Sequence, residues 1–276
     1  MAMAALPFIK MHGLGNDYIF IDCFSKTTVE LIARLDIPAL ARRVSDRHFG
    51  IGADGLVLIL PTKEADAEMR IFNADGSEAE MCGNAIRCVG KYLYESGVCA
   101  DTEISVSTLA GIRKLNLLLT DGVVSRITVN MGTPKIAADS LSLKERDTLG
   151  FISVNIGNPH AVFFRNWLIS DAEMADMGAR ISTHPHFPHG TNVEFVHVRN
   201  MHELDVRVWE RGTGETLACG TGACAAALAA FWMEETEHEV AVHLKGGNLF
   251  IQYDPIDKTV YMTGPATEVF RGQLSV

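Results

Sequence analysis

The stretch from Glu210 to Ala227 contains residues whose types and spacing could carry out chemistry. A polar, glycine-rich loop there delivers Cys219 to the point where a run of small residues predicts the start of a helix. The first N–H groups of a helix have no intrahelical partner and carry the positive end of the helix dipole, so an anion is stabilised there. We therefore expect the Cys219 thiol to be more acidic than an ordinary thiol.

A second stretch, Asn73 to Val89, repeats this construction around Cys82. Aligned on their cysteines, the two stretches share a polar residue nine positions before, a glutamate four before and a glycine one after. These pairs are Asn73 and Glu210, Glu78 and Glu215, and Gly83 and Gly220. Two similar halves could present two thiols across one cleft. That arrangement suits removal of a proton from one face of a carbon and its return to the other, with one sulfur as base and one as acid.

This reaction needs one thiolate and one thiol at once, whereas a free thiol with a pKa of about 8.5 is only slightly ionised at neutral pH. A helix start can stabilise the first anion, and repulsion between two close thiolates keeps the second sulfur protonated, so the pair should titrate as a unit. The α-proton of an amino acid is far less acidic than a thiol, and no feature of the sequence indicates pyridoxal phosphate or a metal. The carbanion must then be stabilised electrostatically. We expect the backbone N–H groups at the two helix starts to bind the reacting carboxylate, with the lobes closing to exclude water. These groups belong to Gly83, Asn84, Gly220 and Thr221.

The other candidate ligands and thiols have simpler interpretations. A lone cysteine is usually a small core residue, which is what we expect of Cys23, Cys88, Cys99 and Cys224. The histidines between positions 184 and 189 are separated by prolines that favour an extended loop, and no carboxylate or cysteine is near them in sequence, so we expect no metal site. A thiol redox or metal-binding protein built on Cys82 and Cys219 is the alternative from another functional class.

The elements that must position the two thiols alternate between strands and helices in both halves. We expect strands at 8–10, 18–24, 56–60, 69–73, 105–108, 113–120, 123–130, 151–155, 161–164, 192–199, 203–210, 240–243, 249–253 and 259–263, and helices at 39–47, 82–96, 171–181 and after Cys219. Asp121-Gly122 is typical of a tight hairpin. Residues 223–233 have no polar face, which predicts a helix buried on all sides and covered by strands. The polar stretch 133–150 is expected to cross into a second domain. We thus predict an α+β fold with an N-terminal lobe (1–130, completed by the tail 265–276) and a C-terminal lobe (131–264).

Residues 50–55 match the G-x-G-x-x-G pattern of a dinucleotide-binding turn. That motif must follow a strand and open a helix. Here a helix is expected before it and the apolar strand 56–60 after it. We therefore exclude nucleotide binding at this turn.

Composition narrows the class of protein. The chain has 276 residues, of which 47% are hydrophobic and 21% charged, with a formal net charge of −10. This acidity argues against nucleic acid or an anionic membrane surface as a partner. The opening seven residues lack the charge and apolar length of a signal peptide, and the apolar run 223–233 is too short to span a membrane. Six cysteines without a C-x-x-C pair favour reduced thiols in the cytoplasm.

Several motifs together resemble the diaminopimelate epimerase family, in the family's order and over nearly the whole chain. They are Lys10 to Tyr18, Phe72 to Ser77, Met81 to Asn84, Gly157 to His160, Thr191 to Phe195 and Glu210 to Ala225. The resemblance implies two lobes of coiled mixed or antiparallel sheet, each wrapped around a central helix, and a homodimer. It also implies cofactor-independent interconversion of LL- and meso-diaminopimelate, for lysine and cell-wall precursor biosynthesis. Cys82 and Cys219 would be the acid and base pair, and the first cysteine would be the base toward the LL-form.

The resemblance also assigns residues that recognise the small amino-acid substrate. These are Asn16, Asn73, Asn158, Asn192, Glu210 and Arg211, with His160 in support. Glu210 suits the reacting ammonium, and Arg211 can grip the distal carboxylate with two parallel hydrogen bonds. Many family members carry Gln where this chain has Gly55, so one side-chain contact to substrate is missing here.

A proline or hydroxyproline racemase is the nearest rival, because that family resembles this fold and also uses two cysteines. In that family a histidine commonly follows Cys-Gly at the first site, where this chain has Asn84. A cyclic imino acid would also have little use for Arg211 beside Glu210. Both differences favour diaminopimelate.

Overall fold

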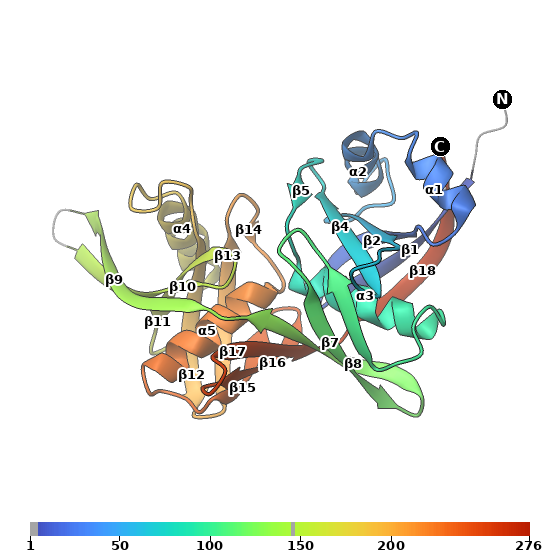
Figure 1. Cartoon of the computed structure of the whole chain (residues 1–276). Coiled ribbons are helices and arrows are strands. Elements are labelled where there is room, and N and C mark those ends of the chain that lie inside the picture. Colours follow the sequence, from blue (N-terminus) through green and yellow to red (C-terminus); the bar gives the residue numbers. More distant parts are fainter. Residues whose placement is uncertain (1–4, 145–146) are drawn as a thin grey trace. The chain divides into compact units, whose positions relative to one another are not determined.

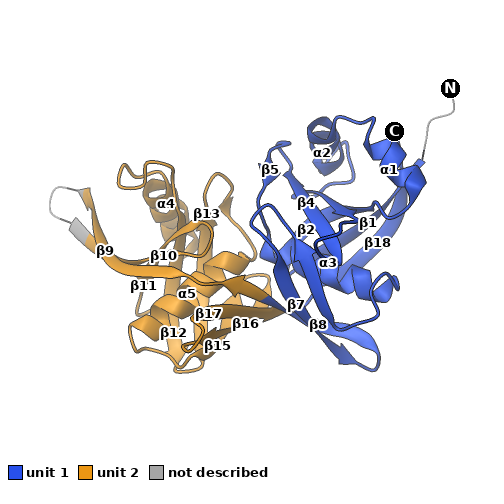
Figure 2. Cartoon of the chain, viewed as in Figure 1, with its two compact units in different colours: residues 1–129, 265–276 blue, residues 130–264 orange. Residues whose placement is uncertain are grey.

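The computed structural model describes residues 5–144 and 147–276 and divides the chain into two compact units (Figure 2). Unit 1 consists of residues 1–129 together with 265–276, and unit 2 of residues 130–264. The first four residues of the opening segment, and positions 145–146 of the expected crossing, lie outside the described residues.

Unit 1 contains a mixed sheet whose strands follow the order β18-β1-β2-β3-β4-β6-β7-β8. The pairs β2–β3 and β4–β6 are parallel, the other neighbours are antiparallel, and the short β5 pairs with β4. Its strands are β1 (Ala5–Gly13), β2 (Asn16–Asp22), β3 (Gly55–Leu60), β4 (Ala67–Asn73), β5 (Glu78–Ala79), β6 (Glu103–Ser107), β7 (Arg113–Thr120), β8 (Val123–Gly132) and β18 (Thr267–Ser275).

Unit 2 contains a sheet with the order β9-β10-β11-β12-β13-β15-β16-β17. Here β11–β12 and β13–β15 are parallel, the other neighbours are antiparallel, and the short β14 pairs with β13. Its strands are β9 (Lys135–Lys144), β10 (Asp147–Asn155), β11 (Pro159–Phe164), β12 (Asn192–Asn200), β13 (Glu203–Glu210), β14 (Gly214–Glu215), β15 (Glu239–Leu244), β16 (Gly247–Asp254) and β17 (Thr259–Gly264).

The two sheets have the same sequence of parallel and antiparallel pairs, so the internal repeat extends from the cysteine loops to the whole unit. In both units a strand ends at the polar residue that begins the loop, Asn73 or Glu210, and a two-residue strand returns beside it. The loop then delivers the cysteine. Two thiols therefore occupy equivalent positions in two equivalent folds.

Each unit encloses the helix that begins after its cysteine (Figure 1). The helices are α1 (Lys26–Ile32), α2 (Ile37–Ser45), α3 (Gly83–Glu95), α4 (Asp171–Ser182) and α5 (Gly220–Trp232). Helix α3 contacts β1, β2, β6 and β7, and α5 contacts β10 to β13 and β15 to β17. Residues 222–230 of α5 are all buried, which confirms the predicted strand-covered helix. The small alanine side chains let the strands approach closely.

The α+β fold with a coiled sheet around a central helix in each lobe is confirmed, and most predicted strands lie within a few residues of the observed ones. The Asp121-Gly122 hairpin is also confirmed, since both residues have positive φ and Thr120 pairs with Val123. The expectation for 133–150 is wrong. Its described residues form β9 and part of β10, which pair as an antiparallel ribbon. Alternation in that stretch was weak because many of its residues are exposed.

Arg87 fixes the start of α3 from inside unit 1. Its side chain is fully buried and donates to the carbonyl oxygens of Pro265 and Gly83 at 3.1 Å and to Asn84 Oδ1 at 2.8 Å. The preceding β1–β2 turn comes so close that a Cβ at Gly13 would lie 2.8 Å from the Arg87 guanidinium. One buried cation thus ties the helix start to the returning C-terminal segment.

Replacing Arg87 by Leu is expected to lower the free energy of unfolding by about 2 kcal/mol, because three acceptors, two of them in buried hydrogen bonds, lose their donor. Urea denaturation followed by circular dichroism measures this change. Arg271→Leu is the control, because its ion pair with Glu268 is on the surface and should contribute under about 1 kcal/mol. Equal losses in the two variants would contradict the role assigned to Arg87.

Candidate active site

Cys82 is the N-cap residue of α3 and is half-buried, which confirms its predicted place at a helix start. Its thiol donates to Asn16 Oδ1 at 3.4 Å, and the Tyr18 hydroxyl donates to its sulfur at 3.6 Å. Within the described part of the chain its side chain makes no capping hydrogen bond to α3. Both of these contacts come from residues of β2.

Asn16 and Asn84 lie together beside Cys82. Asn84 Nδ2 donates to Asn16 Oδ1 at 3.2 Å, and Asn16 Nδ2 donates to Asp54 Oδ2 at 2.7 Å. Asn73 lies at the end of β4 and donates to Ser77 Oγ at 3.0 Å within its own loop. The first intrahelical bond joins the Ile86 N–H to the Cys82 carbonyl, so the N–H groups of residues 83–85 precede the helical ladder, as predicted for an anion-binding start.

Cys219 is the N-cap residue of α5 and is buried, with 5% of its surface exposed. The backbone N–H of Gly222 donates to its sulfur at 3.4 Å, and Thr221 Oγ1 also lies 3.4 Å from it. The first intrahelical bond of α5 joins the Ala223 N–H to the Cys219 carbonyl. We call the residues around each cysteine its half-site. In the Cys219 half-site a backbone N–H donates to the sulfur, and in the Cys82 half-site a tyrosine hydroxyl donates to it.

A chain of hydrogen bonds within unit 2 connects a buried glutamate to Cys219. Glu194 Oε1 lies 2.7 Å from His160 Nδ1, and His160 Nε2 lies 2.9 Å from Asn158 Oδ1. Asn158 Nδ2 donates to Thr221 Oγ1 at 3.3 Å, which reaches the Cys219 sulfur. Glu194 and His160 are almost fully buried, and burial raises the pKa of Glu194 although His160 opposes that shift. The predicted residues Asn158, His160 and Thr221 are thus brought to Cys219.

The remaining predicted residues of unit 2 gather where β13 ends. Thr216 Oγ1 donates to Glu210 Oε1 at 2.5 Å. Asn192 Oδ1 accepts a hydrogen bond from the backbone N–H of Arg211 at 2.9 Å. The Arg211 side chain is exposed and donates to the carbonyl oxygen of His189 at 3.0 Å. Asn192 thereby fixes the backbone on which Glu210 and Arg211 are adjacent.

The predicted acidity of Cys219 is wrong for this arrangement. Burial raises its pKa well above the ordinary value, and the charges of Glu210 and Glu194 raise it further, against the hydrogen bonds from Thr221 and the Gly222 N–H. The helix start is present, but desolvation of the anion and two nearby carboxylates outweigh it. Cys219 is therefore a thiol at neutral pH.

Equivalent ion pairs brace the two cysteine loops. Arg70 Nε donates to Glu78 Oε1 at 2.7 Å in unit 1, and Arg207 Nε donates to Glu215 Oε1 at 2.8 Å in unit 2. These glutamates are the matched pair four residues before each cysteine. Their repetition in the sequence thus reflects loop geometry.

The backbone around Gly55, the position at which the resemblance implies Gln in many family members, leaves no room for a side chain. A Cβ at Gly55 would collide with the carbonyl oxygen of Phe72 and lie 3.0 Å from the Tyr18 ring. The ring of Tyr18 therefore fills the space beside Gly55, and its hydroxyl reaches Cys82. The Tyr18 hydroxyl is thus one of the groups next to this sulfur.

Three of the four cysteines expected in the core are buried there. Cys23, Cys88 and Cys224 are buried, and burial raises the pKa of Cys23 and of Cys88 to about 12. Cys99 is half-buried beyond the end of α3, so its predicted core position is wrong. Among the described residues no group of three or more His, Cys, Asp or Glu side chains is arranged to hold a metal.

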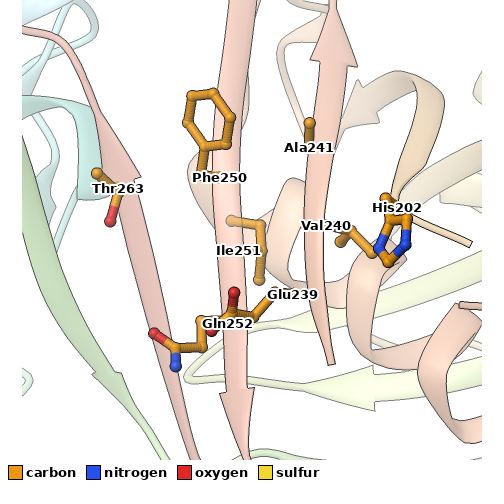
Figure 3. Close-up of a pocket in the computed structure, with 8 residues that line it drawn as sticks. All are labelled: His202, Glu239, Val240, Ala241, Phe250, Ile251, Gln252 and Thr263. Carbon is orange, nitrogen blue, oxygen red and sulfur yellow. The ribbon is translucent and has the colours of Figure 1, made fainter. Parts of the chain in front are cut away.

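No helix within residues 5–144 and 147–276 combines the length and apolar character needed to cross a membrane. The order of helix, glycine turn and strand around residues 50–55 is confirmed by α2 and β3, so this turn lacks the context of a dinucleotide site. A hollow of about 320 Å³ in unit 2 lies on β15 to β17 (Figure 3). None of the described residues lining it is a predicted site residue.

Two buried residues of the half-sites were missed as site residues by the sequence reasoning, Tyr18 and Glu194. Both lie within motifs that carry the resemblance to the family, but the sequence assigned a role to neither residue. A signal was present for Tyr18, because Asn16 precedes it by two residues just as Asn158 precedes His160. For Glu194 the alternation of β12 identifies only a buried position, and the contact with His160 depends on strand pairing.

This chain is similar to known proteins in both sequence and structure. The model of the diaminopimelate epimerase family matches residues 8–137 and 152–269. The diaminopimelate epimerase of Moorella thermoacetica is 47% identical over 280 residues, covering 97% of this chain and 98% of the relative. That of Pelotomaculum thermopropionicum is 49% identical over 284 residues, with the same coverage.

Among solved structures, a hydroxyproline epimerase from Agrobacterium vitis has a TM-score of 0.72 at 15% identity, covering 99% of this chain and 93% of that one. A PhzF-family phenazine biosynthesis protein of Bacillus anthracis has a TM-score of 0.71 at 16% identity, covering 99% and 100%. At this level of identity the likeness establishes the fold alone. The sequence relatives carry the information on activity.

Proposed function

This chain belongs to the diaminopimelate epimerase family and is an amino-acid epimerase of that family, and from this premise we propose its mechanism. One thiolate removes the α-proton of LL-diaminopimelate and the other thiol protonates the opposite face. Cys82 and Cys219 form this pair, without a cofactor. The observation that carries the proposal is their equivalent position, each as the N-cap of the enclosed helix of its unit.

The proposed step conserves protons and electrons. The Cys82 thiolate takes the α-proton, the Cα–H electron pair stays on the substrate, and the Cys219 thiol donates its proton to form the new Cα–H bond. The product is the meso-isomer, and the two sulfurs have exchanged protonation states. The raised pKa of Cys219 supports this assignment of the resting thiol. The reverse reaction starts from the other singly ionised form.

We propose that charge on the substrate is balanced by both helix starts and by unit 2 side chains. The N–H groups of residues 83–84 and 220–221 bind the reacting carboxylate and stabilise the carbanion. Glu210 binds the reacting ammonium, and Arg211, released from the His189 carbonyl, binds the distal carboxylate. Asn16, Asn73, Asn158 and Asn192 supply the remaining polar contacts.

Proton NMR of the reduced protein with LL-diaminopimelate in heavy water tests the function. Deuterium should enter the α-position of the substrate, and the meso-isomer should appear, with no added cofactor. A parallel tube with L-proline tests the racemase alternative. Exchange only in proline would contradict the proposed substrate. Exchange in neither amino acid would contradict the proposed α-proton transfer by the two thiols.

We further propose that the protein is a cytoplasmic homodimer serving lysine and cell-wall precursor biosynthesis. The resemblance to the family implies the dimer. In support, β18 is the last strand of the unit 1 sheet and exposes the apolar side chains of Val269 and Phe270. Sedimentation velocity should show a species of twice the chain mass, and a monomer at micromolar concentration would refute the dimer.

A further inference from the structure

Tyr18 is buried in the Cys82 half-site, where a hydrogen bond and a ring contact hold it in place. It is 6% exposed, its hydroxyl donates to the Cys82 sulfur at 3.6 Å, and its ring packs edge-on to Phe20. Burial and the neighbouring Cys82 raise the pKa of Tyr18 well above its ordinary value. The hydroxyl therefore stays protonated throughout the neutral range and remains a donor.

Gly55 is what allows the ring to occupy this place. Tyr18 pairs with Gly55 in the parallel register of β2 and β3, and Tyr18 Cε1 lies where a side chain of residue 55 would begin. A Cβ at residue 55 would therefore crowd the Tyr18 ring as well as collide with the carbonyl oxygen of Phe72. Gly55 thus contributes no side chain to the site, and the Tyr18 hydroxyl is the functional group that lies there.

Strand register also identifies the counterpart of Tyr18 in unit 2. His160 pairs with Asn192 at the same point of the equivalent parallel pair β11–β12, and Asn158 precedes it as Asn16 precedes Tyr18. Through Asn158 and Thr221, His160 is linked to the Cys219 sulfur. Each unit thus places one titratable side chain of the same strand position in the hydrogen-bond network of its thiol.

We propose that Tyr18 is a positioning residue that holds Cys82 in its reactive, ionised form through its hydroxyl. This inference rests on the proposed function of Cys82 as a base. It adds a group with no place in the resemblance-based set of site residues.

The two polar neighbours of Cys82 favour different protonation states. Asn16 Oδ1 accepts a hydrogen bond from the thiol at 3.4 Å, and this contact becomes repulsive when the proton leaves. The Tyr18 hydroxyl can donate to either form, and it binds the anion more strongly because charge-assisted hydrogen bonds are stronger than neutral ones. Removing the hydroxyl therefore shifts the balance toward the thiol.

The test compares Tyr18→Phe with the wild type and with Tyr92→Phe. Tyr92 is a matched control, because it lies in the same unit and its hydroxyl donates to Asp22 instead of a cysteine. The rate of Cys82 alkylation by iodoacetamide is measured against pH, with the labelled site identified by mass spectrometry. In Tyr18→Phe we expect the midpoint to rise by about one pH unit, and in Tyr92→Phe to stay unchanged.

The same variants are compared in the epimerase assay. Tyr18→Phe should lower kcat/KM at neutral pH about tenfold and move the acid limb of its pH profile upward by the same amount in both reaction directions. Both directions shift together because a variant does not change the equilibrium constant of the reaction, and that constant fixes the ratio of the two kcat/KM values. An unchanged alkylation midpoint in Tyr18→Phe would overturn the proposal. Alkylation needs no substrate, so failure of the wild type to epimerise diaminopimelate is recorded separately as failure of the proposed function.

Discussion

Cys82→Ala and Cys219→Ala are each expected to abolish conversion of LL- to meso-diaminopimelate, with a loss of at least about a thousandfold. Each variant lacks either the group that takes the proton or the group that returns it. Because the two steps occur on opposite faces of one carbon, the remaining thiol cannot do both. Chiral chromatography of the product after overnight incubation measures the residual activity.

The controls for these variants lie in the same helices. Cys88 of α3 and Cys224 of α5 are both fully buried and point into the packing of their units. Their replacement by Ala should keep activity within about threefold and cost about 1 kcal/mol of stability from the lost sulfur contacts. Normal epimerisation by Cys82→Ala would end the two-base mechanism, and an equal loss in all four variants would indicate misfolding instead.

Glu210→Gln is expected to lower kcat/KM about a hundredfold while making Cys219 more acidic. The activity falls because the reacting ammonium loses its ionic partner. The thiol becomes more acidic because the charge of Glu210 is, after burial, the main factor that raises the pKa of Cys219. Ultraviolet absorbance of the thiolate, taken as a difference from Cys219→Ala, should then appear at lower pH than in the wild type.

The fall in kcat/KM and the increased acidity of Cys219 separate two roles of Glu210, binding of the substrate ammonium and control of the thiol pKa. If Glu210 only set the thiol pKa, the Gln variant would be as active as the wild type or more active near neutral pH. Glu203→Gln is the control at the other end of β13, where the carboxylate contacts His243 at 3.2 Å. It should change neither activity nor the Cys219 titration. An unshifted titration in Glu210→Gln would contradict the electrostatic coupling.

This coupling gives the substrate a part in its own activation. While the site is empty, Glu210 and Glu194 both disfavour the Cys219 thiolate. In the proposed mechanism an ammonium bound to Glu210 would neutralise one of these charges, so we expect the Cys219 pKa to fall when substrate is present. The meso-isomer, for which the proposal makes Cys219 the base, would thereby help to ionise the thiol that takes its proton.

The sequence was sufficient for the features that rest on local pattern. The matched cysteine loops, the all-apolar helix and the Asp121-Gly122 turn each contain their information within a few residues. The helix starts at Cys82 and Cys219 could be predicted for that reason. The sign of the Cys219 pKa shift could not, because it depends on burial by the seven strands packed around α5 and on how close Glu210 and Glu194 lie to the sulfur in space.

The contacts among site residues were beyond the reach of sequence patterns for a similar reason. Tyr18 meets Cys82 across 64 positions, and Glu194 meets His160 across 34. The second contact is set by the parallel pair β11–β12, whose register no adjacent turn fixes, and the first by the packing of the start of α3 against β2. Strand β9 and the first part of β10 were missed because many residues of that stretch are polar and the alternation of apolar and polar residues is weak, whereas the second half of β10 was predicted as the strand 151–155.

The position of β18 has a consequence for how the chain acquires its structure during synthesis. Unit 2 is continuous from 130 to 264, whereas unit 1 lacks the strand β18 and the Pro265 carbonyl that receives Arg87 until residues 265–276 have been synthesised. The half of the protein that is translated second can therefore complete its sheet first. The earlier half, with Cys82, must wait with β1 unpaired on the side that β18 later covers, and this open strand edge is vulnerable to mispairing and to proteolysis until residues 265–276 emerge.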